Sequence, residues 1–428
     1  MEIRAFRGWR YCVGPDRDVS RYIAPPYDIL SERDKQELLA ASDKNIVAVD
    51  MPHVPPKDLG PEHLYREAAE RLKQWRTSGV LRREDRPAAY VYEQAFRRAG
   101  RDYTRRALLC GVRATEPGKD VIPHEHTFPG PKADRLKLTE CTQMQLSPIF
   151  GFYSEPSGVV AGAISRAADG PPDARGVLRG VTEKLWAVTD AAAIGDIARA
   201  LRDTPVFIAD GHHRYTTQLN YRDALAAART DPNHEANFVL FALVARDDPG
   251  LLILPTHRII RGMKKSFSIQ RLIDNSPEFA WERCSVHSED LGDADGMLRP
   301  YGAGAMALID ARPRELWIAR LKDRQAMNKI APEQVDAWRA LDVAVLHKLI
   351  IDKDLEPWRT PGLSIEYTPD GKGVLAACTS GAAQLGICLQ ATPLSAVEAV
   401  ARAGQVMPHK STYFYPKLST GMVLKPLE

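Results

Sequence analysis

The segment from residue 205 to residue 227 constrains the fold of this chain more than any other. The apolar run Pro205–Ala209 predicts a buried strand, and Thr216–Ala227 is expected to form a helix. The turn between them is Asp210-Gly211-His212-His213-Arg214-Tyr215. A strand that leads within a few residues into a helix is typical of proteins that mix the two elements, and it excludes an all-helical array.

The chemistry of this turn suits a phosphorylated ligand. Gly211 lets the backbone turn sharply or approach a ligand closely. The first amide groups of a helix are unpaired and its dipole is positive there, so a helix N-terminus favours anions. Arg214 adds a planar fork of donors that matches phosphate. The alternative is structural: His212 and His213 pack against neighbours, and Asp210 is an ordinary helix cap.

The rest of the chain also alternates between strand and helix patterns. Two long strands, Ala88–Phe96 and Tyr103–Val112, are expected to pair across a basic turn, and Leu64–Trp75 predicts an amphipathic helix. Ile46–Asp50 is expected to be a strand, and residues 121–135 and 154–180 are expected to be loops. The predicted fold class is α/β, in the sense of a mixed α+β architecture.

Composition narrows the class of protein. The chain has 428 residues and a net charge of only +3, so no global charge attracts nucleic acid. No apolar run reaches the length of a membrane span, and the first residues lack the apolar segment of a secretory signal; we expect a cytoplasmic protein. The six cysteines are scattered and form no Cys-x-x-Cys pair, which fits buried thiols rather than a zinc knuckle.

A second cluster of reactive residues is Pro123-His124-Glu125-His126-Thr127, followed by Lys132, Asp134 and Arg135. In an extended segment, His124 and His126 would point the same way. They could bind a metal if Asp210, His212 or His213 supplied a further ligand. With Lys132 and Arg135 they could instead form a cationic cradle for phosphate. A solvated polar loop is the third interpretation.

Two more segments carry candidate chemistry. Asp28 follows Pro25-Pro26-Tyr27, a stiff turn that could hold a catalytic base in place; a simple turn is the alternative. Near the C-terminus, Met407–Lys417 gathers lysines, hydroxyls and aromatic rings. These side chains could line a pocket, or the segment could be an ordinary edge strand.

Five segments occur in a fixed order along the chain: Ala24–Asp28, His124–Thr127, Ala209–Tyr215, Leu254–Arg258 and Lys410–Lys417. Together they resemble a known group of bacterial and archaeal proteins, the domain-of-unknown-function family 1015. The resemblance covers essentially the whole chain.

The element at Asp210–Arg214 is also similar to the phosphate-binding box of the ParB/sulfiredoxin-like superfamily. That superfamily includes CTP-binding partition proteins, sulfiredoxin, and free serine kinases that use ADP or ATP. The resemblance implies that a nucleotide-binding core of this type is embedded in the larger mixed sheet. It also implies that Asp210 handles Mg²⁺ or the substrate hydroxyl. The kinases use an N-terminal glutamate as base, and here Glu125 or Asp28 would have to serve.

These considerations give one leading hypothesis and two alternatives. The leading hypothesis is a nucleotide-dependent kinase that phosphorylates the hydroxyl of free L-serine, with ATP or ADP as donor and Mg²⁺ as cofactor. The alternatives are a nucleotide-binding regulatory switch and a metal-dependent hydrolase. The expected partners are a nucleotide and an amino acid. Binding to nucleic acid or to a membrane is not expected, and a homodimer is possible. There is no Walker-type phosphate loop.

The candidate residues fall into four groups by expected role. The expected catalytic residues are Asp210, His213, Glu125 and Asp28. The expected nucleotide-binding residues are Gly211, His212, His213, Arg214, His124, His126, Lys132 and Arg135. The expected substrate-binding residues are Tyr27, Lys410, Ser411 and Thr412, and Asp210 is the expected magnesium ligand. The nucleotide-binding region is expected over residues 1–230, and a second α/β region, which contributes Lys410–Lys417, over residues 231–428.

Overall fold

The computed structural model describes residues 1–56, 58–284, 290–310 and 316–428. The chain divides into two compact units: Met1–Leu251 together with Pro416–Glu428, and Leu252–Tyr415. The boundary expected at residue 230 therefore falls inside the first unit. The reason is that strand β12 (Phe238–Ala245) pairs with strands on both of its edges and lies within the main sheet of that unit.

The main sheet of the first unit is mixed, which confirms the predicted α/β class. Its strand order is β6-β11-β8-β12-β5-β4-β10-β9, and β1 also pairs with β5. The pairs β6–β11 and β8–β12 are parallel, whereas the other neighbours are antiparallel. The remaining bounds are β1 Ile3–Arg4, β4 Ala89–Arg98, β5 Arg101–Arg113, β6 Val121–Ile122, β8 Ile149–Tyr153, β9 Ala174–Leu178, β10 Val181–Val188 and β11 Val206–Asp210.

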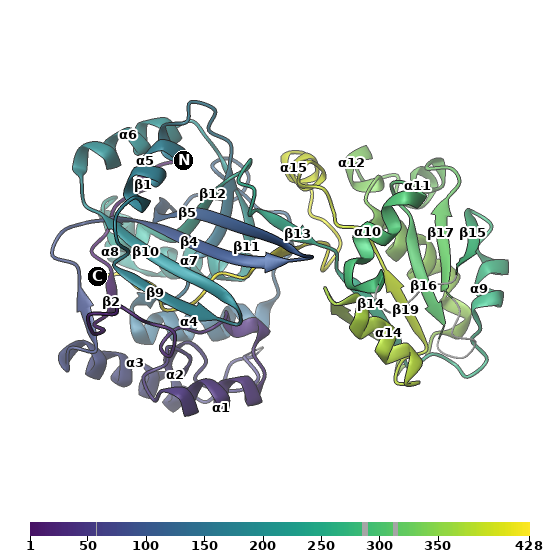
Figure 1. Ribbon diagram of the computed structural model, residues 1–428, viewed down its shortest axis with the longest axis horizontal. Helices are drawn as coiled ribbons and strands as arrows, with labels where there is room; N and C mark the ends of the chain where they lie inside the picture. Colours follow the sequence, from purple (N-terminus) through teal and green to yellow (C-terminus); the bar gives the residue numbers. More distant parts are fainter. Residues whose placement is uncertain (57, 285–289, 311–315) are drawn as a thin grey trace. The chain divides into compact units, whose positions relative to one another are not determined.

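Helices cover the sheet of the first unit, and α5 and α6 lie on one side of it while α1, α2 and α3 lie on the other (Figure 1). Two small sheets join β2 (Trp9–Tyr11) to β3 (Leu81–Arg83) and β7 (Met144–Gln145) to β21 (Lys425–Pro426). The helices are η1 Tyr27–Ile29, α1 Glu32–Ala41, α2 Val47–Asp50, α3 Glu62–Thr77, α4 Pro129–Thr142, α5 Val159–Ala168, α6 Ala191–Leu201, α7 His212–Ala224, α8 Ala226–Thr230 and η2 Glu235–Asn237.

The predicted long hairpin and amphipathic helix are confirmed. Strands β4 and β5 pair along their whole length, with Tyr90 opposite Leu109 and Arg98 opposite Arg101. Helix α3 buries Tyr65, Ala68, Leu72 and Trp75, which recur at the spacing of one helical face. Strong periodicity over ten or more residues therefore predicted these elements correctly.

Three local predictions are wrong. Ile46–Asp50 is not a strand: residues Val47–Asp50 form the single turn α2, because the side chain of Asn45 accepts a hydrogen bond from Val47 N at 3.0 Å and starts a helical turn. The expected loop 121–135 contains β6 and the start of α4, where Pro129 stands in the first turn and favours a helix start. The expected loop 154–180 contains α5 and β9.

The second unit is built on an antiparallel sheet in the order β15-β17-β16-β19-β14-β18, and a separate pair joins β13 to β20. Its strands are β13 Leu252–Leu254, β14 His257–Arg261, β15 Phe279–Cys284, β16 Met306–Asp310, β17 Leu316–Leu321, β18 Ser364–Thr368, β19 Leu385–Cys388 and β20 Tyr413–Tyr415. Its helices are α9 Ile269–Asn275, η3 Asp290–Asp293, α10 Ala294–Leu298, η4 Arg299–Tyr301, α11 Gln325–Ile330, α12 Asp336–Arg339, α13 Asp342–Val345, η5 Leu346–Asp354, η6 Glu356–Trp358, α14 Gly371–Thr379 and α15 Leu394–Arg402.

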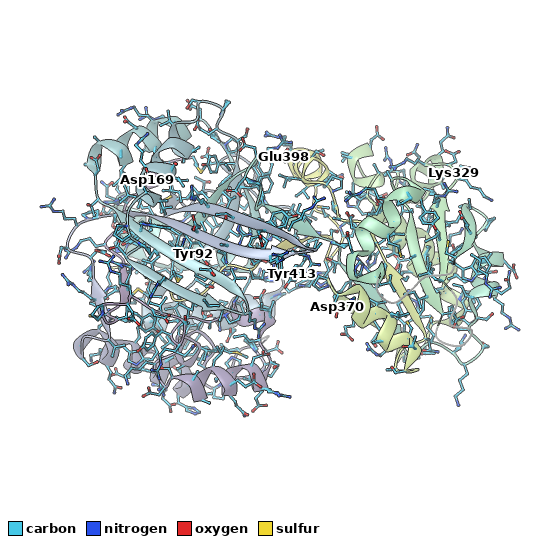
Figure 2. All side chains as sticks on the ribbon, in the orientation of Figure 1. Tyr92, Asp169, Lys329, Asp370, Glu398 and Tyr413 are labelled. Atoms are coloured by element: carbon cyan, nitrogen blue, oxygen red, sulfur yellow. The ribbon has the colours of Figure 1, made fainter. Side chains whose placement is uncertain are left out.

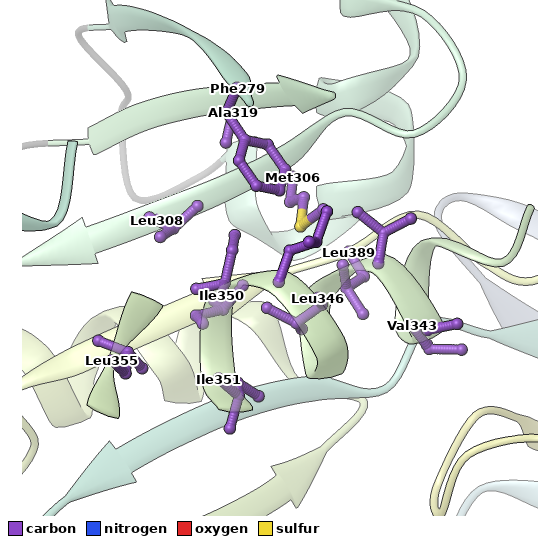
Figure 3. Packing of buried hydrophobic residues seen from close by; sticks show 14 of the residues in the cluster. Phe279, Met306, Leu308, Ala319, Val343, Leu346, Ile350, Ile351, Leu355 and Leu389 are labelled. Atoms are coloured by element: carbon purple, nitrogen blue, oxygen red, sulfur yellow. The ribbon is translucent and has the colours of Figure 1, made fainter. Parts of the chain in front are cut away.

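The second unit has an apolar core of its own. Figure 3 shows Met306 and Leu308 of β16 facing Leu346 and Ile350 of the π-helical stretch η5, and all four side chains are buried. A second buried cluster of the same unit includes Ala307 and Ile309, the alternate residues of β16. Burial of these apolar side chains stabilises the unit. In the described part of the chain, no helix has the length and apolar character that a membrane span requires.

Candidate functional site

The turn between β11 and α7 is a helix N-terminus with a glycine at its cap. Gly211 has a φ of 100°, a conformation that side-chain-bearing residues rarely adopt, and α7 begins at His212 rather than at the expected Thr216. The first hydrogen bond of the helix runs from Tyr215 N to Gly211 O at 2.9 Å. The amide groups of the three residues before Tyr215 therefore precede the helical ladder and make an anion-favouring end.

Asp210 is held between two cations at this helix end. Lys417 Nζ donates to one oxygen of the Asp210 carboxylate, and Arg214 Nη2 donates to the other at 2.9 Å. The side chains of Lys417 and Asp210 are only 13% and 18% exposed, so the ion pair is shielded from solvent. Burial alone would raise the pKa of Asp210, but the charges of Lys417 and Arg214 outweigh it and hold that pKa far below its usual range.

Arg214 is fixed on three sides. Its Nη1 donates to Ser147 Oγ at 3.2 Å and to Pro148 O at 2.5 Å, in addition to the bond to Asp210. A Cβ added at Gly211 would come within 3.0–3.2 Å of the Arg214 guanidinium. The bare glycine thus gives Arg214 the room to reach Asp210.

Two buried histidines lie beside this helix end. His212 Nε2 accepts a hydrogen bond from His124 N at 3.2 Å, and the two rings meet edge to face with centroids 4.7 Å apart. Burial lowers the pKa of His124 to about 4 and holds the pKa of His212 well below its ordinary value. Both rings are therefore neutral near pH 7.

The hydrogen bond at Nε2 fixes the tautomer of His212. A neutral imidazole that accepts at one nitrogen carries its proton on the other, so the proton of His212 is on Nδ1. Nδ1 lies 3.8 Å from Glu125 Oε2. This places a partly exposed carboxylate next to the helix end.

His213 and His126 behave differently from the buried pair. His213 Nε2 accepts from Phe128 N at 2.9 Å and its ring stacks on Phe128, which leaves Nδ1 as the donor nitrogen. His126 is exposed while His124 is buried, so the two do not share a face as expected. Residues 123–128 form no regular strand, and this removes the period-two alternation.

Among the described residues, no group of three or more His, Cys, Asp or Glu could hold a metal ion.

A second polar cluster, next to Arg214, surrounds Arg135. Arg135 Nε donates to Asp134 Oδ2 at 2.6 Å, and Nη1 donates to Asp50 O at 2.6 Å. The guanidinium carbon lies 4.0 Å from the centroid of the Tyr27 ring. Burial raises the pKa of Asp50, although the charges of Arg135 and Arg214 oppose it. Tyr27 and Arg135, which are both expected site residues, are therefore in contact.

The C-terminal segment that re-enters the first unit is held against the main sheet at Pro416 and Lys417. Arg105 Nη2 donates to Pro416 O at 2.6 Å, and Gln94 Nε2 donates to Lys417 O at 3.1 Å. Arg105 is fully buried, and burial lowers its pKa to about 10. These two side chains fix the backbone on both sides of the Pro416–Lys417 peptide bond.

The same anchor continues through Glu183 on strand β10. Glu183 Oε1 accepts from Ser419 Oγ at 2.8 Å and from Gln94 Nε2 at 3.1 Å, and Glu183 Oε2 accepts from the hydroxyl of Tyr92, which is labelled on the sheet in Figure 2. Burial raises the pKa of Glu183. A buried carboxyl with three donors is costly to disturb, because any donor lost leaves a polar group without its bond.

The structure brings together most of the predicted residues of the first unit. We call the group at the start of α7 the α7 site; its members are Asp210, Gly211, His212, His213, Arg214, His124, Glu125 and Lys417. Lys132, on α4, is half-buried, and Asp28 is exposed on η1. Lys410, Ser411 and Thr412 belong to the second unit, where Ser411 Oγ donates to Pro408 O.

Sequence reasoning gave Lys417 only a place in a segment that could line a pocket, and it assigned no role to Asp50. Lys417 stands in a segment that the resemblance singles out, but nothing in its spacing says that it pairs with a residue 207 positions away. Asp50 closes an apolar run that predicts a strand, and only the turn of α2 directs it toward Arg135. No local pattern could have found either partner.

Comparison with solved structures gives weak likenesses. Free serine kinase in complex with AMP matches with a TM-score of 0.33 and 11% identity over 69% of this chain and 83% of that chain. SbnI with a C-terminal truncation, from Staphylococcus aureus, matches with a TM-score of 0.36 and 11% identity over 74% of this chain and 87% of that one. A conserved hypothetical protein from Pyrococcus furiosus matches with a TM-score of 0.33 and 13% identity over 72% and 92%.

At these TM-scores and identities, the solved structures carry no argument about activity. No curated protein matches the sequence. The sequence profile of one family does match, over residues 3–344, which is most of the chain. The chain belongs to the family described as Protein of unknown function (DUF1015).

Proposed function

We propose that the α7 site binds the phosphates of a nucleotide and transfers a phosphoryl group to the hydroxyl of a small molecule. The observation that carries the proposal is that Lys417 and Arg214 share Asp210 at the N-terminus of α7. Phosphoryl transfer depends mainly on positioning and on stabilising negative charge. Two cations and a helix end at one place supply that environment.

Glu125 is the base that this geometry favours over Asp28. Its carboxylate adjoins the start of α7 through His212, whereas Asp28 is exposed on η1. In the proposed step, the hydroxyl oxygen of the substrate forms a bond to the terminal phosphorus of the nucleotide while the bond to the bridging oxygen breaks. The hydroxyl proton passes to Glu125, and AMP leaves if the donor is ADP, or ADP leaves if it is ATP.

The other residues bind or orient in this proposal. The amides at the start of α7 and the Nδ1 of His213 donate to phosphate oxygens, and Lys417 and Arg214 balance their charge. Asp210 is a positioning residue, because it holds both cations. The choice of free L-serine as the substrate, and the assignment of β11–α7 to a ParB/sulfiredoxin-like nucleotide-binding core, rest on the resemblance of the sequence motifs.

Asp210 does not fit the expected role of magnesium ligand in this arrangement. Each oxygen of its carboxylate accepts a hydrogen bond from a cationic side chain. A divalent cation prefers oxygen ligands that are not already neutralised by neighbouring ammonium or guanidinium groups. No step of the proposal is therefore routed through a metal held by Asp210.

A product assay tests the proposal. Folded protein is incubated with L-serine and with ADP or ATP, in the presence of Mg²⁺, and O-phosphoserine is measured by mass spectrometry. We expect product with the wild-type chain and little with Glu125→Gln. If the nucleotide binds but no amino acid or other small hydroxyl compound is phosphorylated, the transfer step is wrong and the regulatory switch becomes the better account.

A further inference from the structure

A small cavity lies beside the first turns of α7 and has Arg214, Thr217 and Gln218 in its lining. It has a volume of about 50 Å³, against the roughly 10–15 Å³ that one water requires. It is walled by α4, α7, β8 and β12. A nucleotide is far too large for this space, whereas a compact ligand of a few heavy atoms matches it.

Two buried polar atoms of the residues that line the cavity have no hydrogen-bond partner in the part of the chain that the structure describes. They are Arg135 Nη2 and Thr217 Oγ1, on side chains whose residues are 5% and 2% exposed. A buried donor without a partner costs about 1–3 kcal/mol, and more when it is charged. Two such atoms on residues that line one cavity are therefore a reason to expect a ligand that bonds to them.

The charges around the cavity have both signs. Arg135 is one of the lining residues; its Nε and Nη1 are taken by Asp134 and Asp50, and its Nη2 is buried without a partner among the described residues. Asp50 also lines the cavity, and the contact of its Oδ1 with Arg135 is long, at 3.3 Å. A guanidinium suits a carboxylate, and a carboxylate suits an ammonium group.

Apart from Arg214, the rest of the wall is uncharged. It includes the apolar residues Leu138, Ile149 and Val239 and the polar residues Gln145 and Gln218. An apolar wall with a few placed polar groups is typical of a small-molecule site. The cavity therefore has room for a ligand with a compact side chain, but not for a ligand whose side chain is also charged.

We propose that this cavity binds the zwitterionic head of a small α-amino acid, with its carboxylate on Arg135 and Thr217 and its ammonium group on Asp50. Arg214 lines the cavity and also pairs with Asp210, so a bound amino acid adjoins the α7 site. The inference deepens the proposed function by assigning a subsite to its substrate class, and its test measures binding alone.

The test is calorimetric titration of the full chain with L-alanine and L-serine. We expect both to bind, because the head group and not the hydroxyl makes the contacts. Acetate and ethanolamine each carry one of the two charges, and we expect each to bind at least tenfold more weakly than L-alanine. Equal binding of acetate and L-alanine would overturn the proposal in favour of a simple anion site.

Variants locate the binding. Thr217→Val keeps the volume of the side chain and removes the hydroxyl, so it should weaken L-alanine binding several-fold; Thr216→Val, one position away on α7 and outside the cavity, is the matched control. Arg135→Lys should abolish binding, and its folding is checked by circular dichroism. Unchanged affinity in Thr217→Val and in folded Arg135→Lys overturns the site, even if phosphoserine is formed. Binding of L-alanine without any phosphoryl transfer supports the site and counts against the proposed function.

Discussion

Lys417 and Asp210 form a shielded ion pair although 207 positions separate them in the sequence. The pair joins the returning C-terminal segment to the end of β11, directly before the glycine that caps α7. It therefore builds the α7 site from the two separate chain segments that make up the first unit. The positive charge that the site offers to a phosphate depends on this long-range contact.

The first prediction concerns Lys417 itself. Lys417→Met removes a charge-assisted bond, which is worth about 1.5–3 kcal/mol. We expect nucleotide affinity to fall by about 10- to 100-fold, since each 1.4 kcal/mol is a factor of ten. Titration with ADP measures it, and Lys119→Met, at an exposed lysine outside the site, is the control. Equal losses in both variants would mean that only net charge matters.

Gly211→Ala tests the conformation of the helix cap. The substitution places a side chain at a φ of 100° and brings its Cβ within about 3.0 Å of the Arg214 guanidinium. We expect lower thermal stability and weaker nucleotide binding, because Arg214 must move away from Asp210. Gly118→Ala is the matched control: its φ is 115°, but nothing lies within 4 Å of the added Cβ. The control variant Gly118→Ala should have a lower thermal stability but an unchanged affinity for the nucleotide.

Glu125 and Asp28 are the two candidate bases, and substitution separates them. Glu125→Gln should lower kcat by about 10²–10⁴-fold, the usual contribution of a general base, and leave nucleotide affinity nearly unchanged. Asp28→Asn should change kcat little, because Asp28 is exposed on η1. The reverse ranking of the two variants in the phosphoserine assay would show that the base is wrongly assigned.

His124 should make the stability of the chain dependent on pH. Its pKa is about 4 in the folded state and 6.5 when unperturbed, so the unfolded chain binds more protons between these values. Its stabilising contribution is then complete above pH 6.5 and is lost as the pH falls toward 4, by roughly 3 kcal/mol in all. Urea unfolding at pH 7 and at pH 4.5 measures this effect. Between the two pH values, the free energy of unfolding should fall more for the wild type than for His124→Gln. His63→Gln, on an exposed face, should follow the wild type.

Ser419 tests the anchor that positions Lys417. Ser419→Ala removes a 2.8 Å bond to the buried Glu183 and should destabilise the first unit by about 1–3 kcal/mol. It should also weaken nucleotide binding, since the backbone that carries Lys417 is loosened. Ser380→Ala, an exposed serine of the second unit, is the control. A loss of stability without any loss of affinity would show that the anchor does not position Lys417.

The sequence predicted those parts of the fold whose signal is local. The β4–β5 hairpin and α3 carry strong periodicity over many residues, and the strand before Asp210 is a continuous apolar run. Residues 46–50 and 121–135 were predicted wrongly because a single side-chain hydrogen bond from Val47 N to Asn45 and a proline at 129 decide the backbone there. Such short-range effects compete with weak propensities and are not visible in a hydrophobic pattern.

The candidate site was predictable in its residue types and not in its contacts. The glycine, the histidines and Arg214 lie in one short segment, so their proximity was given by the chain. The neutral tautomer of His212 depends on His124, and the charge of Asp210 depends on Lys417; both partners come from elsewhere in the fold. The same kind of long-range contact places residue 230 inside the first unit, because β12 enters the centre of a sheet whose partners lie far earlier in the sequence.

The most direct test of the central claim is to measure phosphoserine by mass spectrometry after incubation of the folded chain with L-serine and either ADP or ATP, with nucleotide binding measured on the same samples. The account predicts phosphoserine with the wild-type chain, and little or none with Glu125→Gln or Lys417→Met. Nucleotide binding without phosphorylation of any small hydroxyl compound would contradict phosphoryl transfer. No nucleotide binding at all would contradict the assignment of the α7 site.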